Sequence, residues 1–174
     1  EVSGFDQPQL MMDLSARADH VDFEQSRELL VNAAPQMNAL YTIFQPRGQV
    51  DVALRICRKT PDAPLAVSGT AACHDVEMTY AGFPYCLERV HGAVQFGPEG
   101  FETRDLEGRH GQATVRVEGW AKNLGPTPEI QMRVSASRVA LDDSLRAALR
   151  PEHRPISDQY APSGTADAPL AVHQ

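Results

Sequence analysis

Residues 112–119 read QATVRVEG and residues 129–136 read EIQMRVSA, and these two stretches decide the fold. Apolar side chains alternate with polar ones in both stretches, which is the period of a β-strand that buries one face. The apolar positions that share a face are Ala113, Val115 and Val117 in the first stretch and Ile130, Met132, Val134 and Ala136 in the second. The sequence therefore predicts strands with one buried and one solvated face.

The first half of the chain shows the same alternation. In residues 50–57, the positions that share a face are Val50, Val52, Leu54 and Ile56. Residues 65–71 and 76–80 repeat the pattern, and residues 90–96 fit it less cleanly, with Gly92 as a candidate bulge. Turn residues separate these runs at 97–100, 107–111 and 123–126. Such regular spacing of strands and turns predicts an antiparallel meander.

Two segments break the alternation and are predicted to be helical. Asp142 and Asp143 suit the N-terminus of a helix, where free N–H groups favour negative charge, and Pro151 ends that helix. Residues 24–34 form a similar segment that Pro35 ends. A second short helix is expected after each proline, and the predicted ranges are residues 36–44 and 152–160.

The two helical segments align with each other along the chain. At an offset of 118 residues Val21 meets Val139, and at an offset of 116 Gly48 meets Gly164. The order of strand, helix, proline, helix and strand therefore occurs twice, which indicates repeats that stack an unfinished sheet on a neighbour. Chance similarity is the alternative. We interpret residues 1–58 as the end of one repeat, residues 59–128 as a central meander and residues 129–174 as the start of the next.

Composition restricts the class of protein. The chain has 174 residues, 42% of them hydrophobic, and 16 Lys and Arg against 23 Asp and Glu give a net charge of −7. Nucleic acids and anionic membrane surfaces need a basic footprint, so no nucleic acid partner is predicted. No stretch approaches the ~18 apolar residues of a membrane span. The chain starts at Glu1 without a basic and apolar leader, and we expect a piece of a longer protein.

Motifs for catalysis or metal binding are missing from the sequence. The six histidines form no HxH, HxxxH or HExxH pattern, and they are His20, His74, His91, His110, His153 and His173. The chain has no G-x-S-x-G elbow and no phosphate-binding glycine loop. The three cysteines lack CxxC spacing and are interpreted as small strand hydrophobes; they are Cys57, Cys73 and Cys86. We therefore predict no enzyme, no cofactor and no metal.

Two further stretches carry a resemblance to a known family. Residues 83–96 read FPYCLERVHGAVQF and residues 106–119 read LEGRHGQATVRVEG. Both resemble the glycine-punctuated strands of the AsmA/TamB-like envelope proteins, which belong to the bridge-like lipid transfer group. The resemblance implies a mainly β fold with short helical insertions, in which a curved antiparallel sheet, taco-like or an open sandwich, is built from repeats. It also implies a periplasmic location, with the parent protein anchored in the inner membrane.

The expected function follows from that resemblance and from the apolar positions. An apolar sheet groove holds acyl chains by removing their surface from water, at ~0.8 kcal/mol per methylene. The residues predicted to line it are Val115, Val117, Ile130, Met132, Val134, Val52, Leu54 and Ile56. The resemblance implies a function in lipid transport or outer-envelope assembly. The alternative function is that of a protein–protein interaction module on the cell envelope. The same residues would equally build an ordinary core. Exposed sheet edges also favour a homo-oligomer.

Overall fold

The computed structural model describes residues 12–33, 37–58, 60, 63–123, 127, 129–160 and 162–173. Its strands are β1 (Met12–Asp22), β2 (Gln49–Arg58), β3 (Ala66–Tyr80), β4 (Phe83–Gly97), β5 (Gly100–His110), β6 (Ala113–Lys122), β7 (Glu129–Ala140) and β8 (Thr165–His173). Its helices are α1 (Arg27–Ala33), α2 (Met37–Phe44), α3 (Asp143–Ala148) and α4 (Arg154–Tyr160).

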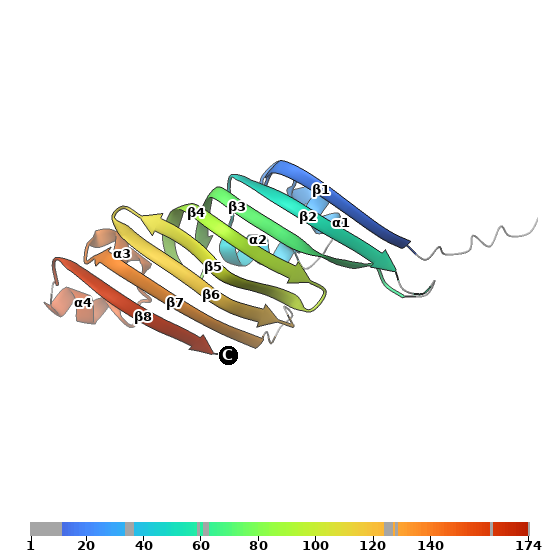
Figure 1. The fold of residues 1–174 in the computed structure, drawn as a ribbon. Coiled ribbons are helices and arrows are strands. Elements are labelled where there is room, and N and C mark those ends of the chain that lie inside the picture. Colours follow the sequence, from blue (N-terminus) through green and yellow to red (C-terminus); the bar gives the residue numbers. More distant parts are fainter. Residues whose placement is uncertain are drawn as a thin grey trace, which may run out of the picture.

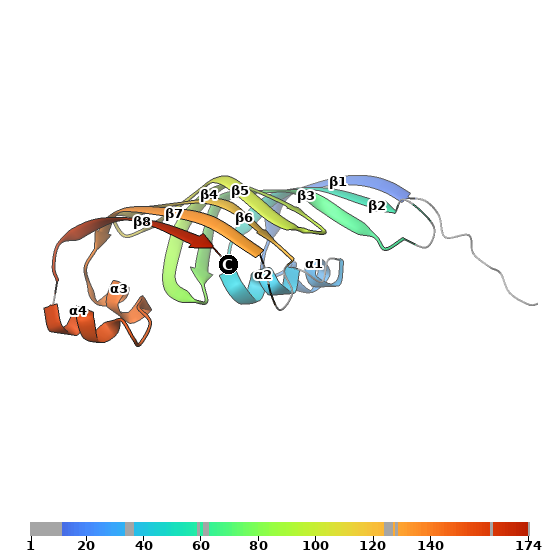
Figure 2. The ribbon, with the colours of Figure 1, turned by 90° about the horizontal axis from the view of Figure 1, so that it is seen from below.

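The strands form one antiparallel sheet in chain order, from β1 at one edge to β8 at the other (Figure 1). The sheet is curved and does not close on itself, and the helix pairs α1–α2 and α3–α4 are insertions between β1 and β2 and between β7 and β8. Both pairs lie on the same side of the sheet (Figure 2). The prediction of a mainly β fold with short helical insertions and a curved antiparallel sheet is confirmed.

The register sorts the side chains into two faces. Residues paired across neighbouring strands share a face, and one row runs through Val52, Ala71, Val94, Thr103, Gly119 and Met132. The opposite face carries ion pairs between neighbouring strands, and they are Arg55–Asp13 at 2.7 Å, Arg116–Glu107 at 2.6 Å and Arg133–Glu118 at 2.6 Å. The alternation in the sequence therefore produces one apolar and one charged face.

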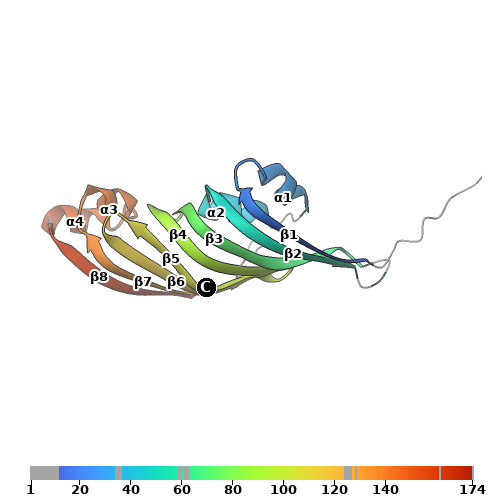
Figure 3. The same cartoon turned by 45° about the horizontal axis from the view of Figure 1, so that its top comes forward.

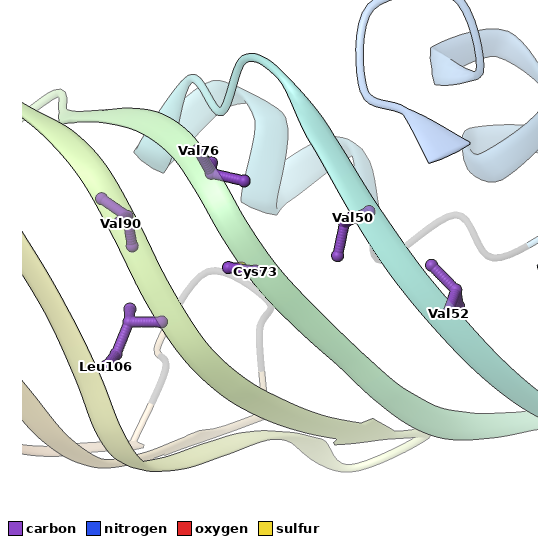
Figure 4. Packing of buried hydrophobic residues seen from close by; sticks show 6 residues of the cluster. All are labelled: Val50, Val52, Cys73, Val76, Val90 and Leu106. Atoms are coloured by element: carbon purple, nitrogen blue, oxygen red, sulfur yellow. The ribbon is translucent and has the colours of Figure 1, made fainter. Parts of the chain in front are cut away.

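Among the described residues, two clusters of buried side chains form the core. The larger one comes from β2 to β5 and contains Val50, Val52, Cys73, Val76, Val90 and Leu106 (Figure 4). The smaller one joins the sheet to α3 and contains Tyr85, Ala113, Val139 and Ala148. Each helix pair reaches the same apolar face: Ala148 of α3 lies in the smaller cluster, and Phe44 of α2 contacts Phe101 of β5. The core thus lies on one face of the sheet, where that face meets the helices.

β-Bulges accompany the bend of the sheet, which Figure 3 shows from a third angle. His20, Arg89 and Arg138 have φ values of 57°, 54° and 56°, and each precedes a valine. All three lie where an extra residue shifts the strand register. A bulge kinks its strand and increases the local twist, so these positions help to turn the sheet around its apolar face.

Residues 107–111 do not form the predicted turn, because β5 continues to His110. A Cβ on Gly108 would lie 2.9 Å from Cγ2 of Val90 and 3.2 Å from Cβ of Leu87. The glycine therefore permits close packing inside the sheet, and the turn follows at Gly111. The two strands predicted at 65–71 and 76–80 are one strand, β3, with a register shift inside it.

The segments aligned at offsets of 118 and 116 share their backbone geometry. The N–H of His20 donates to Oδ1 of Asp51, and the N–H of Arg138 donates to Oδ1 of Asp167, both at 2.8 Å. Val21 pairs with Val50 after the first bulge, and Val139 pairs with Ala166 after the second. Val139 lies 118 residues after Val21, and Ala166 lies 116 residues after Val50, so the paired residues match the sequence alignment. The same bulge and the same carboxylate acceptor therefore occur beside both helix pairs.

Candidate functional site: the apolar face of the sheet

The apolar face is the candidate site, and we define it by the side chains that share the face of Val52. Along each strand these are alternate residues, because successive side chains of a strand point to opposite faces. All eight predicted groove-lining residues lie on it, and they are Val52, Leu54, Ile56, Val115, Val117, Ile130, Met132 and Val134. Two of them, Val52 and Val115, are buried, and the other six are half-buried.

Helix α2 covers the middle of the apolar face. The ring of Phe44 meets the ring of Phe101 edge-on, with centroids 5.8 Å apart, and lies 5.8 Å from the ring of Tyr80. Tyr41 is buried one turn earlier, and its hydroxyl donates to the carbonyl oxygen of Phe23 at 2.9 Å. These aromatic contacts hold the helix pair on the sheet. The central strands therefore use part of the apolar face as an ordinary core.

The apolar face is more open at the ends of β1, β2 and β3 that lie away from the α1–α2 insertion. Leu14 on β1 is 50% exposed, and its cross-strand partner Ile56 is half-buried. Leu65, just before β3, is 47% exposed. On the other side of α2, the side chains of Ile130 and Met132 along β7 are half-buried. The apolar face thus continues beyond the clusters that the helices cover, and apolar surface is accessible at its ends.

In the part of the chain that the structure describes, the opposite face carries charged side chains paired between neighbouring strands. A shallow hollow there is lined mainly by polar and small side chains of β1 to β3, including Ser15, Arg17, Ser68 and Thr70. The Arg116 guanidinium beside Glu107 holds the pKa of that carboxyl below its usual value. The ion pairs of this face are largely exposed, and such pairs contribute little to stability. They keep this face in water and leave the opposite face for apolar contacts.

The structure also assembles one polar cluster that sequence motifs did not indicate. His110 lies 3.1 Å from Oγ of Ser144, whose hydroxyl donates to Oδ1 of Asp142 at 2.6 Å. Asp142 is the N-cap of α3 and also accepts the backbone N–H groups of Ser144 and Leu145, so this cluster joins the helix cap to β5. Only the cap at Asp142 was predictable, since His110 is 34 residues away in sequence.

Metal chemistry has no candidate in the described part of the chain. There, no group of three His, Cys, Asp or Glu side chains is placed to hold a metal ion. The three cysteines are free thiols on β2, β3 and β4. Nε2 of His74 and Oδ2 of Asp51 lie 2.8 Å apart on the exposed side of the sheet. The arrangement that dominates the molecule is therefore the apolar face.

Comparison with family models, with curated proteins and with solved structures finds no match for this chain. Within the described residues, none of the helices has the length and apolar character to cross a membrane.

Proposed function

We propose that this chain is a non-enzymatic segment of a larger AsmA-like envelope protein that carries or shields lipid acyl chains on its apolar face. One observation carries the proposal: a single apolar face crosses the curved sheet from β2 to β7, while the opposite face is charged. Acyl chains match such a face, because the stabilisation scales with the apolar area removed from water. In this proposal the parent protein is periplasmic and anchored in the inner membrane.

The half-buried residues of β7 provide the sharpest test. Met132 lies on the apolar face, and its neighbour Gln131 lies on the exposed face. We expect the chain purified from bacteria to retain phospholipid in native mass spectrometry. Met132→Glu should lose most of that lipid, because a carboxylate on an apolar surface is costly to desolvate.

Gln131→Glu is the matched control, since it adds the same charge one residue away on the other face. It should retain lipid as the unmodified chain does. Circular dichroism would verify that both variants keep the sheet. A chain that purifies without lipid, or equal lipid retention by the two folded variants, would rule the proposal out.

A second candidate is an interaction module on the envelope, with the helix pairs as its contact surface. The observation that favours it is Tyr160 at the end of α4, which is 72% exposed, and aromatic side chains are enriched at protein interfaces. Crosslinking in envelope extracts through a photoreactive residue at position 160 tests it. Recovery of one partner protein by crosslinks at this position, and not from a site on the charged face, would favour this candidate over lipid binding.

A further inference from the structure

Arg58 is the last residue of β2, and its side chain lies on the apolar face with Ile56, Leu54 and Val52. The register of β1 with β2 has no bulge between Val52 and Arg58, so the side chains alternate strictly between the faces. Among the described strand residues that pairing places on this face, Arg58 is the single Lys, Arg, Asp or Glu. A permanent positive charge therefore lies on the apolar face, at the end of β2 away from the α1–α2 insertion (Figure 1).

The guanidinium of Arg58 has no partner among the described residues. Its Nε is buried and donates no hydrogen bond, and no ion pair joins it to a described carboxylate. On the opposite face, by contrast, Arg55, Arg116 and Arg133 each form an ion pair with a carboxylate on a neighbouring strand. A buried donor without an acceptor has lost its hydrogen bond to water and gained none in return. Arg58 therefore offers a binding position for an anion.

The apolar side chains beside Arg58 are partly open to solvent. Leu14 on β1 is 50% exposed and lies opposite Ile56, which precedes Arg58 by two residues on the same face. Ile56 and Leu54 are half-buried, whereas Val52 is buried in the larger cluster. Accessible apolar surface thus leads from the guanidinium along β2 toward the cluster. A ligand that fits both features has an anionic group at one end and an apolar chain at the other.

We propose that Arg58 binds the phosphate headgroup of an amphiphile whose alkyl chain lies over Ile56, Leu54 and Leu14. The guanidinium fork matches phosphate oxygens with two parallel hydrogen bonds. The alkyl chain gains stability by removing its own surface and that of the leucines and isoleucine from water. This inference rests on the proposed function, and it adds an orientation: the headgroup lies at the end of β2, and the chain points toward the larger cluster.

The second repeat provides an internal comparison, because it lacks the arginine. At the offset of 116 residues Leu54 aligns with Leu170, and Arg58 aligns with Gln174. Gln174 is outside the described residues, so the comparison uses its identity alone. A glutamine side chain is neutral and cannot form a charge-assisted bond from its own amide to phosphate as strong as that of a guanidinium. Arg58→Gln therefore gives the first repeat the residue type that the second one has.

The net charge of the chain opposes a general attraction for anions. It is −7, so the long-range field repels a phosphate group. A preference for an anionic ligand over a neutral one must therefore come from a local cation. On the apolar face, among the described strand residues, that cation is Arg58.

Isothermal titration calorimetry of the whole chain tests the proposal with dodecyl phosphate and dodecyl maltoside, each below its critical micelle concentration. The two probes share an alkyl chain and differ in the charge of the headgroup. We expect dodecyl phosphate to bind about tenfold more tightly, the lower end of what a hydrogen bond to a charged group contributes. Inorganic phosphate alone should bind far more weakly than dodecyl phosphate, because it buries no apolar surface.

Arg58→Gln should bind the two amphiphiles with equal affinity and keep the affinity of the unmodified chain for dodecyl maltoside. Arg17→Gln is the matched control, because it removes the same charge from the opposite face of β1, where the side chain of Arg17 is 78% exposed. This variant should keep the preference for dodecyl phosphate. Circular dichroism would verify that both variants keep the sheet.

The other outcomes separate this inference from the proposed function. If the unmodified chain binds both amphiphiles alike, or if the two folded variants lose the preference equally, Arg58 does not hold the headgroup, while the apolar face still binds alkyl chains. If inorganic phosphate binds as tightly as dodecyl phosphate, the position takes a free anion and the amphiphile is ruled out. If neither amphiphile binds, the proposed function fails and this inference fails with it.

Discussion

Cys73 is the thiol that the sheet protects best. It is 5% exposed within the larger cluster, and burial raises its pKa to about 11. Cys57 and Cys86 are half-buried on neighbouring strands. The thiolate is the reactive form, so a buried thiol with a raised pKa reacts slowly.

We therefore predict that iodoacetamide at pH 8 modifies Cys57 and Cys86 well before Cys73 in the folded chain. Peptide mass spectrometry at successive times measures the order. In denaturant all three should react at similar rates, which is the control. Equal rates in the folded chain would show that the cluster around Cys73 opens readily.

Gly119 marks a place where two strands approach too closely for a side chain. Its φ is +138°, and an added Cβ would lie 2.1 Å from the carbonyl oxygen of Gln131. Gly111, at the turn after β5, has a φ of +57° and open space where its Cβ would lie. The two glycines therefore separate the effect of crowding from that of backbone conformation.

Gly119→Ala should lower the free energy of unfolding by more than the roughly 1–3 kcal/mol that a strained backbone conformation costs by itself. Gly111→Ala should cost only about 1–2 kcal/mol, the penalty of a left-handed residue. Urea titration followed by circular dichroism measures both. A smaller effect at Gly119 than at Gly111 would contradict the close approach of β6 and β7.

At the scale of the elements, each bulge beside a helix pair depends on a carboxylate. The N–H of His20 lowers the pKa of Asp51 below its usual 3.8, and the contact with His74 lowers it further. A carboxyl with a lowered folded pKa contributes stability that is complete above its unfolded pKa. That contribution disappears as the pH falls through the lower, folded value.

Asp51→Ala should therefore lower the denaturant midpoint at pH 7, because the N–H of His20 loses its acceptor. The difference from the unmodified chain should shrink as the pH falls below 3.8. Asp19→Ala is the control, because it removes another carboxylate from the same bulge. The side chain of Asp19 is exposed, and its Oδ1 lies 3.5 Å from Nε of Arg17. A difference that grows in acid would contradict this role of Asp51.

At the scale of the whole molecule, β1 and β8 are the edge strands of the sheet that the described residues form. The N–H of Leu141 donates to the carbonyl of Gly164, so even-numbered residues of β8 turn their backbone groups toward β7. Odd-numbered residues, including Pro169, turn toward the free edge. Proline has no N–H, and it is tolerated on edge strands for that reason. Pro169 therefore removes a donor from the middle of the β8 edge, which discourages pairing with another strand.

We predict that Pro169→Ala promotes self-association through β8. Sedimentation velocity over a range of concentrations should show larger species at lower concentration than for the unmodified chain. Pro151→Ala, between α3 and α4 and away from the edge, should leave the sedimentation unchanged. If Pro169→Ala and the unmodified chain sediment alike at every concentration, the proline does not protect this edge.

Much of the fold was predictable because strand alternation is local. The face shared by Val115 and Val117 follows from the period of two, and the cap at Asp142 follows from the preference of helix N-termini for carboxylates. The alignment of Val21 with Val139 also brought together two positions that follow bulges of the same geometry, although no bulge was predicted at either one. The turn expected at residues 107–111 was wrong, because a glycine that packs against Val90 has the same sequence signal as a glycine in a turn.

The sequence by itself determined which side chains share a face, where the helices interrupt the strands and which face is charged, because those features depend on neighbours a few residues apart. Only the tertiary structure decided how much of the apolar face α2 and α3 cover, and that His110 meets Ser144. These contacts join residues far apart in the chain, and they depend on strand register and on bulges set by backbone hydrogen bonds. Residue type alone does not encode that register, so no local pattern contained it.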